Sequence, residues 1–122
     1  MKKVLLVEDE NLIRRGLKFQ MDWTAVNCVV AGEAASGQEG LEQIQNLQPD
    51  IVITDIRMPV MDGLEATRKI REFNSTIPIL AVTAFAFESD KEKAREAGCS
   101  GFITKPISVS LLKEQIKNAL NG

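Results

Sequence analysis

The sequence contains no histidine and no tyrosine. Without histidine, this chain cannot hold a Ser-His-Asp triad, a His-ligated zinc ion or a phosphohistidine relay. Any chemistry that it performs must use carboxylates, lysine, Ser or Thr hydroxyls, backbone groups or a hard metal ion.

Cysteines and long apolar runs are also scarce. The two cysteines, Cys28 and Cys99, lie far apart without metal-ligand spacing, so we expect reduced thiols of a cytoplasmic protein. No apolar run is long enough to span a bilayer. The basic start at Lys2 and Lys3 is followed by too few apolar residues for a signal peptide.

Charge of either sign is not in large excess. The 15 basic and 17 acidic residues leave a net charge of -2, which gives no general attraction for nucleic acid or an anionic membrane. A chain of 122 residues with 44% hydrophobic content fits one domain with a single core, and we expect that domain to cover residues 1–122.

Strand-like and helix-like patterns alternate along the chain. The strand-like segments are 3–7, 28–33, 50–54, 79–82 and 102–104, and the helix-like segments are 10–21, 37–47, 64–73, 88–97 and 108–120. Repeated strand–helix units with short links predict an α/β fold: a doubly wound, three-layer arrangement with helices on both faces of a parallel sheet.

Apolar residues at helical spacing indicate which side of each helix faces the core. The residues expected there are Leu12, Ile13, Leu17, Met21, Leu41, Ile44, Leu47, Ala66, Ile70, Phe73, Leu112, Ile116 and Leu120. Ser108 is expected to cap the last helix. The segment 88–97 has few apolar anchors, so we expect a weakly held helix there.

Charged and hydroxyl side chains stand at the ends of four predicted strands. Glu8 and Asp9 follow the first strand, Asp55 ends the third, Thr83 ends the fourth and Lys105 follows the fifth. In a parallel sheet these strand ends lie on one edge, where open α/β sheets place their chemistry. Each residue alone is more commonly a helix cap, a backbone-bonded hydroxyl or a solvated lysine. These ordinary roles do not explain why such residues occur together, in order, at the ends of four strands.

Three carboxylates that crowd together repel one another unless a cation joins them. Hard oxygen ligands suit Mg²⁺, which prefers a few carboxylates and retains several waters. A lysine and a hydroxyl beside them suit a phosphoryl group, and aspartate is a nucleophile in such chemistry. Asp55 is therefore a candidate covalent centre.

Four motifs run in order along the chain: VLLVEDE, DIVITDIRMPVMDG, PILAVTA and FITKP. With them the chain resembles a receiver domain of a two-component response regulator, of the CheY-like family, over essentially its whole length. The resemblance implies a flavodoxin-like (βα)5 fold with the strand order 2-1-3-4-5. It also implies a signalling phosphoacceptor that catalyses only its own phosphorylation and dephosphorylation.

For the metal site, the resemblance implies Mg²⁺ held directly by Asp9 and Asp55. The backbone carbonyl of Arg57 would be a further ligand, and Glu8 would act through a metal-bound water. Asp55 would accept its phosphoryl group from the phosphohistidine of a sensor histidine kinase or a phosphotransfer protein.

For the switch, the resemblance implies that Thr83 and Lys105 contact the phosphoryl oxygens and that the Lys105–Pro106 bond is cis. Thr83 and Phe102 would then move, changing the face formed by the fourth helix, fifth strand and fifth helix. This face would be a possible homodimer surface. Arg57 and Phe85 flank the site by family position and are expected to influence the lifetime of the phosphoryl group.

The chain departs from many family members at two positions: Glu8 replaces an aspartate, and Phe102 replaces a frequent tyrosine. Residues 21–23 and 30–37 are similar to receivers attached to AraC-type DNA-binding domains. Residues 85–106 are more similar to receivers of hybrid kinases or stand-alone regulators. The output beyond Gly122, including a DNA-binding domain, therefore stays open, and no nucleic-acid contact by this domain itself is expected.

Four other functions fit parts of the sequence. A receiver-like interaction module that needs no phosphorylation would not require the complete acid, threonine and lysine set. A haloacid-dehalogenase-type phosphatase needs an acid where Arg57 stands. Gly32 and Gly37 have P-loop spacing, but Gln38 and Glu39 follow in place of Lys and Ser/Thr. A flavodoxin-like electron carrier would use phosphate-cradling loops rather than an acid cluster.

Overall fold

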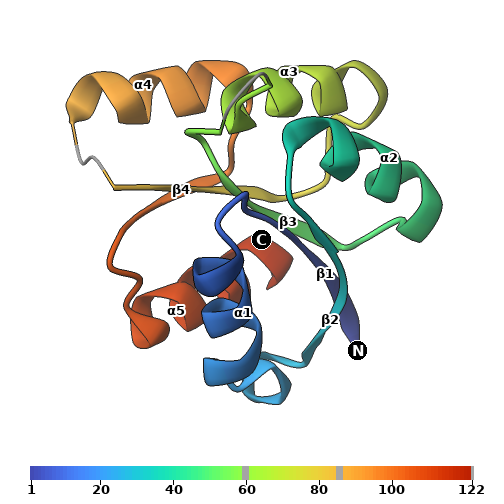
Figure 1. Ribbon diagram of the computed structural model, residues 1–122, viewed down its shortest axis with the longest axis vertical. Helices are drawn as coiled ribbons and strands as arrows, with labels where there is room; N and C mark the ends of the chain where they lie inside the picture. The colour runs from blue at the N-terminus through green and yellow to red at the C-terminus, as the bar shows by residue number, and fades with distance from the viewer. Residues whose placement is uncertain (59–60, 85–86, 122) are drawn as a thin grey trace.

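Five parallel strands form one sheet in the order β2-β1-β3-β4-β5 (Figure 1). The structure is a computed structural model and describes residues 1–58, 61–84 and 87–121. The strands are β1 (Lys2–Val7), β2 (Cys28–Ala34), β3 (Ile51–Asp55), β4 (Ile79–Thr83) and β5 (Gly101–Thr104). The helices are α1 (Asn11–Gln20), α2 (Gly37–Leu47), α3 (Gly63–Phe73), α4 (Glu88–Ala97) and α5 (Val109–Asn121), with a 3-10 helix η1 (Trp23–Val26).

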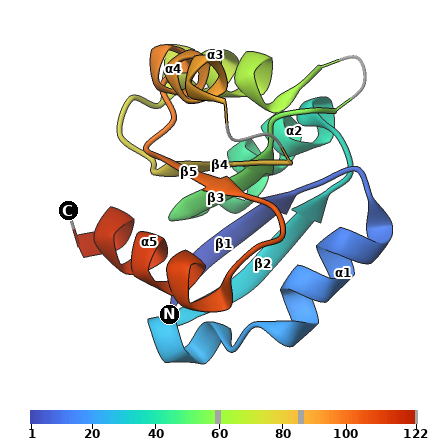
Figure 2. The same ribbon diagram turned by 90° about the vertical axis from the view of Figure 1, so that its left-hand side faces the viewer.

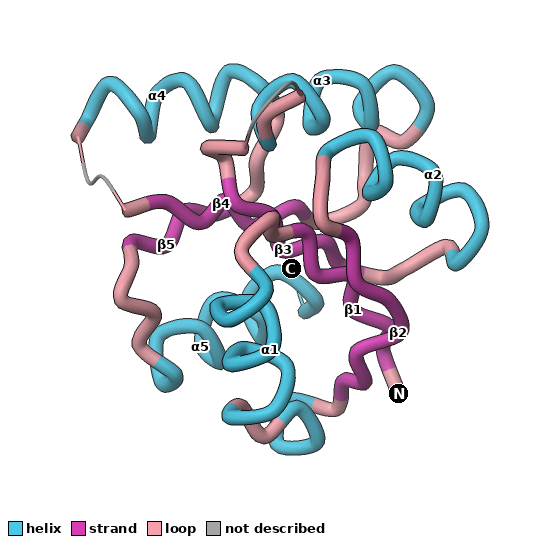
Figure 3. Tube along the Cα trace, in the orientation of Figure 1, coloured by secondary structure: helices cyan, strands magenta, loops and turns pink. Residues whose placement is uncertain are grey.

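The predicted fold and strand order are confirmed, and the helices cover both faces of the sheet. In Figures 2 and 3, α2, α3 and α4 lie on one face and α1 and α5 on the other. Successive strand residues point to opposite faces. In β1, Val4 and Leu6 therefore join the cluster that includes α5, while Leu5 and Val7 join the cluster under α2 and α3.

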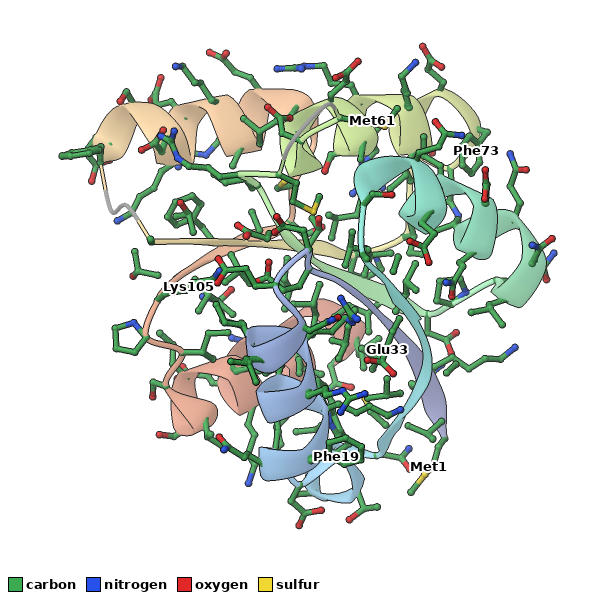
Figure 4. All side chains as sticks on the ribbon, viewed as in Figure 1. Met1, Phe19, Glu33, Met61, Phe73 and Lys105 are labelled. Atoms are coloured by element: carbon green, nitrogen blue, oxygen red, sulfur yellow. The ribbon has the colours of Figure 1, made fainter. Side chains whose placement is uncertain are left out.

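The core-facing prediction is wrong for two residues. Leu12 is 87% exposed, because the apolar stripe of α1 runs through Ile13, Leu17 and Met21 at intervals of four residues and Leu12 lies about 100° around the helix from Ile13. Phe73 is 50% exposed, since it is the last residue of α3 and lies at the periphery of the molecule (Figure 4).

Local side-chain bonds explain where three helices begin. Ser36 Oγ accepts from the backbone N–H of Glu39 at the start of α2, and Ser108 Oγ accepts from Leu111 N–H at the start of α5. Asp62 Oδ1 accepts from the N–H of Glu65 at 2.8 Å and so caps α3. This last cap fixes the chain direction just after the carboxyl end of β3.

The helix η1 is absent from the predicted pattern. Its buried residue Trp23 donates its indole N–H to the carbonyl of Lys18, and the segment ends at Asn27 in the left-handed conformation. Asparagine tolerates this conformation better than most residues. No helix in the described parts of the chain is long and apolar enough to cross a membrane.

Candidate functional site

The strand register places two acids side by side at the carboxyl edge of the sheet. Val7 of β1 pairs with Thr54 of β3, so the next residues along the two strands are Glu8 and Asp55. Both side chains are buried. This follows from the parallel arrangement, in which neighbouring strands end at the same edge.

The next two strands contribute a hydroxyl and an amine to the same edge. Asp55 pairs with Val82 of β4, so the next residue, Thr83, lies at the strand end beside the acids. The backbone N–H of Lys105 donates to the carbonyl of Thr83 at 2.7 Å, which joins the ends of β4 and β5. Thr83 is fully buried, and Lys105 lies on the segment that leads from β5 to α5 (Figure 4).

Three carboxylates form a cluster that could hold a metal ion. Glu8, Asp9 and Asp55 each offer one oxygen, and these oxygens lie within 4.8 Å of one another. Mg²⁺ binds oxygen at about 2.1 Å, so ligands on opposite sides of the ion lie about 4.2 Å apart. The distances between the three carboxylate oxygens are close to this value. A set of oxygen ligands alone suits a hard cation.

Lys105 neutralises part of this cluster. Its Nζ donates to Glu8 Oε1 at 2.7 Å and to Asp55 Oδ2 at 3.3 Å, and its side chain is only 17% exposed. Burial lowers the pKa of Lys105, but the bond to Glu8 and the charges of Asp55 and Glu8 together raise that pKa above its usual value. The amine is therefore a permanent cation in the site.

Glu8 is the group in this site whose charge responds to pH near neutrality. Burial raises the pKa of Glu8 from 4.5 to about 7; the hydrogen bond from Lys105 opposes the rise, and the neighbouring Asp55 adds to it. With one lysine for three carboxylates, the site favours a proton or a further cation.

This raised pKa predicts a pH-dependent stability for the metal-free protein. Between pH 4.5 and about 7, Glu8 is protonated in the folded state and ionised in the unfolded state. The stability contributed by the protonated form is therefore complete below pH 4.5 and is lost as the pH rises through about 7. Urea unfolding in EDTA should show this decline. An equal decline in Glu8→Gln would contradict the assignment.

The segment after β3 closes tightly over the backbone of Asp55. The N–H of Arg57 donates to Asp55 Oδ1 at 3.2 Å, and the N–H of Gly63 donates to the carbonyl of Ile56 at 3.1 Å. A Cβ at position 63 would lie 2.2 Å from the Asp55 carbonyl oxygen and 2.8 Å from Ile56 Cα. Only glycine fits there without a shift of the backbone that carries the site.

We expect Gly63→Ala to destabilise the fold by about 1–3 kcal/mol or more, because the added methyl group meets backbone atoms that cannot rotate away. The matched control is Gly16→Ala in α1, where the nearest atom would be Gln20 Oε1 at 3.9 Å. Alanine at this helical position should be stabilising by about 0.5–1 kcal/mol. Chemical denaturation of both variants checks the contrast, and equal effects would contradict it.

Two contacts in or beside the site were not predicted. Arg14 donates from Nη1 to the backbone carbonyl of Glu8 at 2.6 Å. Arg57 is expected to offer its backbone carbonyl to the metal ion and to influence the lifetime of the phosphoryl group, but its contact with α4 is new: Nη2 lies 3.4 Å from Oδ1 of the buried Asp90. An aspartate in the first turn of a weakly apolar helix is the one sequence signal for the second contact.

The remaining predicted residues lie around this centre. Phe102 is half-buried against a small apolar cluster that includes Ala81 and Ala94, and its carbonyl accepts from Gln115 Nε2. The Lys105–Pro106 peptide bond is cis. Phe85 lies outside the described residues.

Comparisons with known proteins agree with this geometry. The family model of the response regulator receiver domain matches residues 4–117. The polar-differentiation response regulator DivK of Brucella ovis is 36% identical over 121 residues, covering 98% of this chain and 96% of that protein.

Solved structures give the same result. The receiver domain of AraT from Geobacillus stearothermophilus has a TM-score of 0.88 and 29% identity, covering 98% of this chain and 93% of its own. The chemotaxis protein CheY4 of Vibrio cholerae has a TM-score of 0.85 and 30% identity, covering 98% of this chain and 99% of its own. This chain belongs to the receiver domains of two-component response regulators.

Proposed function

We propose that Asp55 is the phosphoacceptor of this receiver and reacts in a Mg²⁺-dependent step. Receiver domains interact with histidine kinases or phosphotransfer proteins, so the donor is a phosphohistidine of such a partner. The observation that carries the proposal is the setting of the Asp55 carboxylate. One oxygen accepts from Arg57 N–H, the other accepts from Lys105 Nζ, and two further carboxylates lie beside it.

The reaction is an in-line transfer. An Asp55 oxygen forms a bond to phosphorus while the bond from phosphorus to the donor imidazole nitrogen breaks, and the electron pair returns to the imidazole. Asp9, Asp55 and the Arg57 carbonyl would hold Mg²⁺, with Glu8 acting through water. The ion, when bound, would neutralise charge on the phosphoryl oxygens. Later attack of water on phosphorus breaks the bond to the Asp55 oxygen and releases inorganic phosphate, so the receiver catalyses only its own phosphorylation and dephosphorylation.

Lys105 and Thr83 supply the protein's own contacts to the transferred group. The Lys105 amine is already 3.3 Å from Asp55 Oδ2, so a small movement brings it to a phosphoryl oxygen. The buried Thr83 hydroxyl stands at the neighbouring strand end. Together they would stabilise the charge that develops during transfer, in a site whose Glu8, Asp55 and Thr83 side chains are buried.

The acyl phosphate carries about two negative charges where the carboxylate carried one. This local change biases a two-state element, which we assign to Thr83, Phe102 and the α4–β5–α5 face, a possible homodimer surface. A shift from 1% to 99% active needs about 5.5 kcal/mol of differential stabilisation.

The helix α4 is anchored by two small side chains, Ala94 and Ala97. They bury little apolar area, which suits a segment of low local stability.

We also propose that residues 1–122 form one receiver domain with a cytoplasmic location. Phosphohistidine donors of this kind act there, and the net charge of -2 gives no reason to expect a membrane surface as partner.

The direct test is phosphorylation by acetyl phosphate with Mg²⁺, followed by intact mass and by amide NMR with beryllofluoride as a stable mimic. We expect one phosphoryl group and shifts around Asp55, Thr83 and α4. The single Trp23 precedes β2 at the opposite edge of the sheet, so NMR is a better reporter than intrinsic fluorescence. A protein that takes up neither reagent in the presence of Mg²⁺ would refute the proposal.

A further inference from the structure

The ion pair between Arg57 and Asp90 joins the segment after β3 to the first turn of α4. Arg57 Nη2 lies 3.4 Å from Asp90 Oδ1; the arginine side chain is 57% exposed and the aspartate side chain 10%. The other oxygen, Asp90 Oδ2, is buried and has no hydrogen-bond partner in the structure as described. Asp90 is thus a buried carboxylate that depends on a largely exposed guanidinium for its counter-charge.

Arg57 is also part of the phosphorylation site. Its backbone N–H donates to Asp55 Oδ1 at 3.2 Å, so its side chain begins next to the carboxylate that we propose is phosphorylated. From this backbone position a long arginine side chain can extend toward α4 or fold back over Asp55. A guanidinium can bind phosphoryl oxygens with two parallel hydrogen bonds, whereas its contact with Asp90 joins Nη2 to one oxygen at 3.4 Å.

We propose that Asp90 is a positioning residue that holds the Arg57 guanidinium beside α4 and releases it to the phosphoryl oxygens once Asp55 is phosphorylated. This inference rests on the proposed function. Two anions compete for one guanidinium: a carboxylate with one negative charge and an acyl phosphate with about two. The transfer of the guanidinium is favoured only when the phosphoryl group is present.

The transfer has a consequence for α4. A buried carboxylate that loses its counter-charge is strongly unfavourable, and Asp90 Oδ2 already has no hydrogen-bond partner among the described residues. A movement of the first turn of α4 that exposes the Asp90 carboxylate to water is then favourable. Arg57 and Asp90 in this way couple the phosphorylation site to the helix that carries part of the switching face.

The test is a double-mutant cycle on the affinity for beryllofluoride in the presence of Mg²⁺. Asp90→Asn removes the negative charge that holds the guanidinium beside α4, so it should tighten binding about fivefold, the factor expected for a partly exposed ion pair. In the Arg57→Gln background, Asp90→Asn should leave the affinity unchanged. The matched control is Glu88→Gln, which removes an acid from the same helical turn; Glu88 is 87% exposed and pairs with Lys91 at 3.7 Å. It should leave the affinity unchanged.

A second readout needs no substitution at Asp90. The side-chain Nε–H resonance of Arg57, assigned by comparison with Arg57→Gln, should shift when beryllofluoride binds to the wild-type protein. If Asp90→Asn does not fold, Asp90→Ser replaces it in the cycle.

Two results would overturn the inference while the proposed function stands: an Asp90→Asn effect of equal size with and without Arg57, or an Arg57 resonance that beryllofluoride leaves in place. Either result would mean that Asp90 only stabilises the structure of α4. A wild-type protein that fails to bind beryllofluoride would overturn both the function and this inference.

Discussion

Asparagine at position 55 is expected to abolish phosphorylation by acetyl phosphate, with a loss of at least about a thousandfold, because an amide is not a nucleophile toward phosphorus. The substitution preserves the shape of the side chain, and the amide oxygen can still accept from the N–H of Arg57. The fold should therefore remain. Intact mass spectrometry after incubation with acetyl phosphate and Mg²⁺ measures the result, with amide NMR to show that the variant is folded.

Asp62→Asn is the matched control for this experiment. Asp62 is seven positions further along the chain and caps α3 through a bond from Glu65 N–H, a role that asparagine fills equally well. This variant should be phosphorylated like the wild-type protein. A stable Asp55→Asn protein that still gains the mass of a phosphoryl group would place the acceptor elsewhere. A comparable loss in Asp62→Asn would show that the assay reports general damage to the segment after β3.

The residues that meet in the site could be predicted because they lie at the carboxyl ends of the strands. In a parallel sheet, register alone decides which residues become neighbours at the carboxyl edge. Val7 beside Thr54 and Asp55 beside Val82 are consequences of that register. The positions of Glu8 and Asp55 therefore required no knowledge of individual side-chain conformations.

The contacts that escaped prediction depend on loops and on long side chains. The pair Arg57–Asp90 links residues 33 apart in the sequence, from a loop to a helix that only the structure places in reach of each other. Periodicity predicted α4 but not that a charged residue would be buried in its first turn. The exposure of Leu12 and Phe73 was also not predicted, for two different reasons: Leu12 lies off the apolar stripe of α1, and Phe73 is the last residue of α3.

Removing the cation of the site should have the second-largest effect. In Lys105→Met, Glu8 and Asp55 lose the amine that lies 2.7 Å and 3.3 Å from their oxygens, while their side chains remain only 7% and 6% exposed. Loss of one partner from a buried charge pair costs about 3–5 kcal/mol, so we expect destabilisation of this order in EDTA above pH 8. Phosphorylation should slow by about 10²–10³-fold, as when one group that stabilises transition-state charge is removed.

The pH dependence of this variant separates an electrostatic role from a packing role. The pKa of Glu8 is already raised to about 7 with the lysine present, so without it protonation of Glu8 at lower pH should recover part of the lost stability. Excess Mg²⁺ should do the same at high pH by supplying another cation. The control Lys117→Met, on the exposed side of α5, should stay within about 0.5 kcal/mol of the wild-type protein. Equal destabilisation of Lys105→Met at pH 5 and pH 8, with no recovery by Mg²⁺, would mean that Lys105 acts through its aliphatic stem rather than its charge.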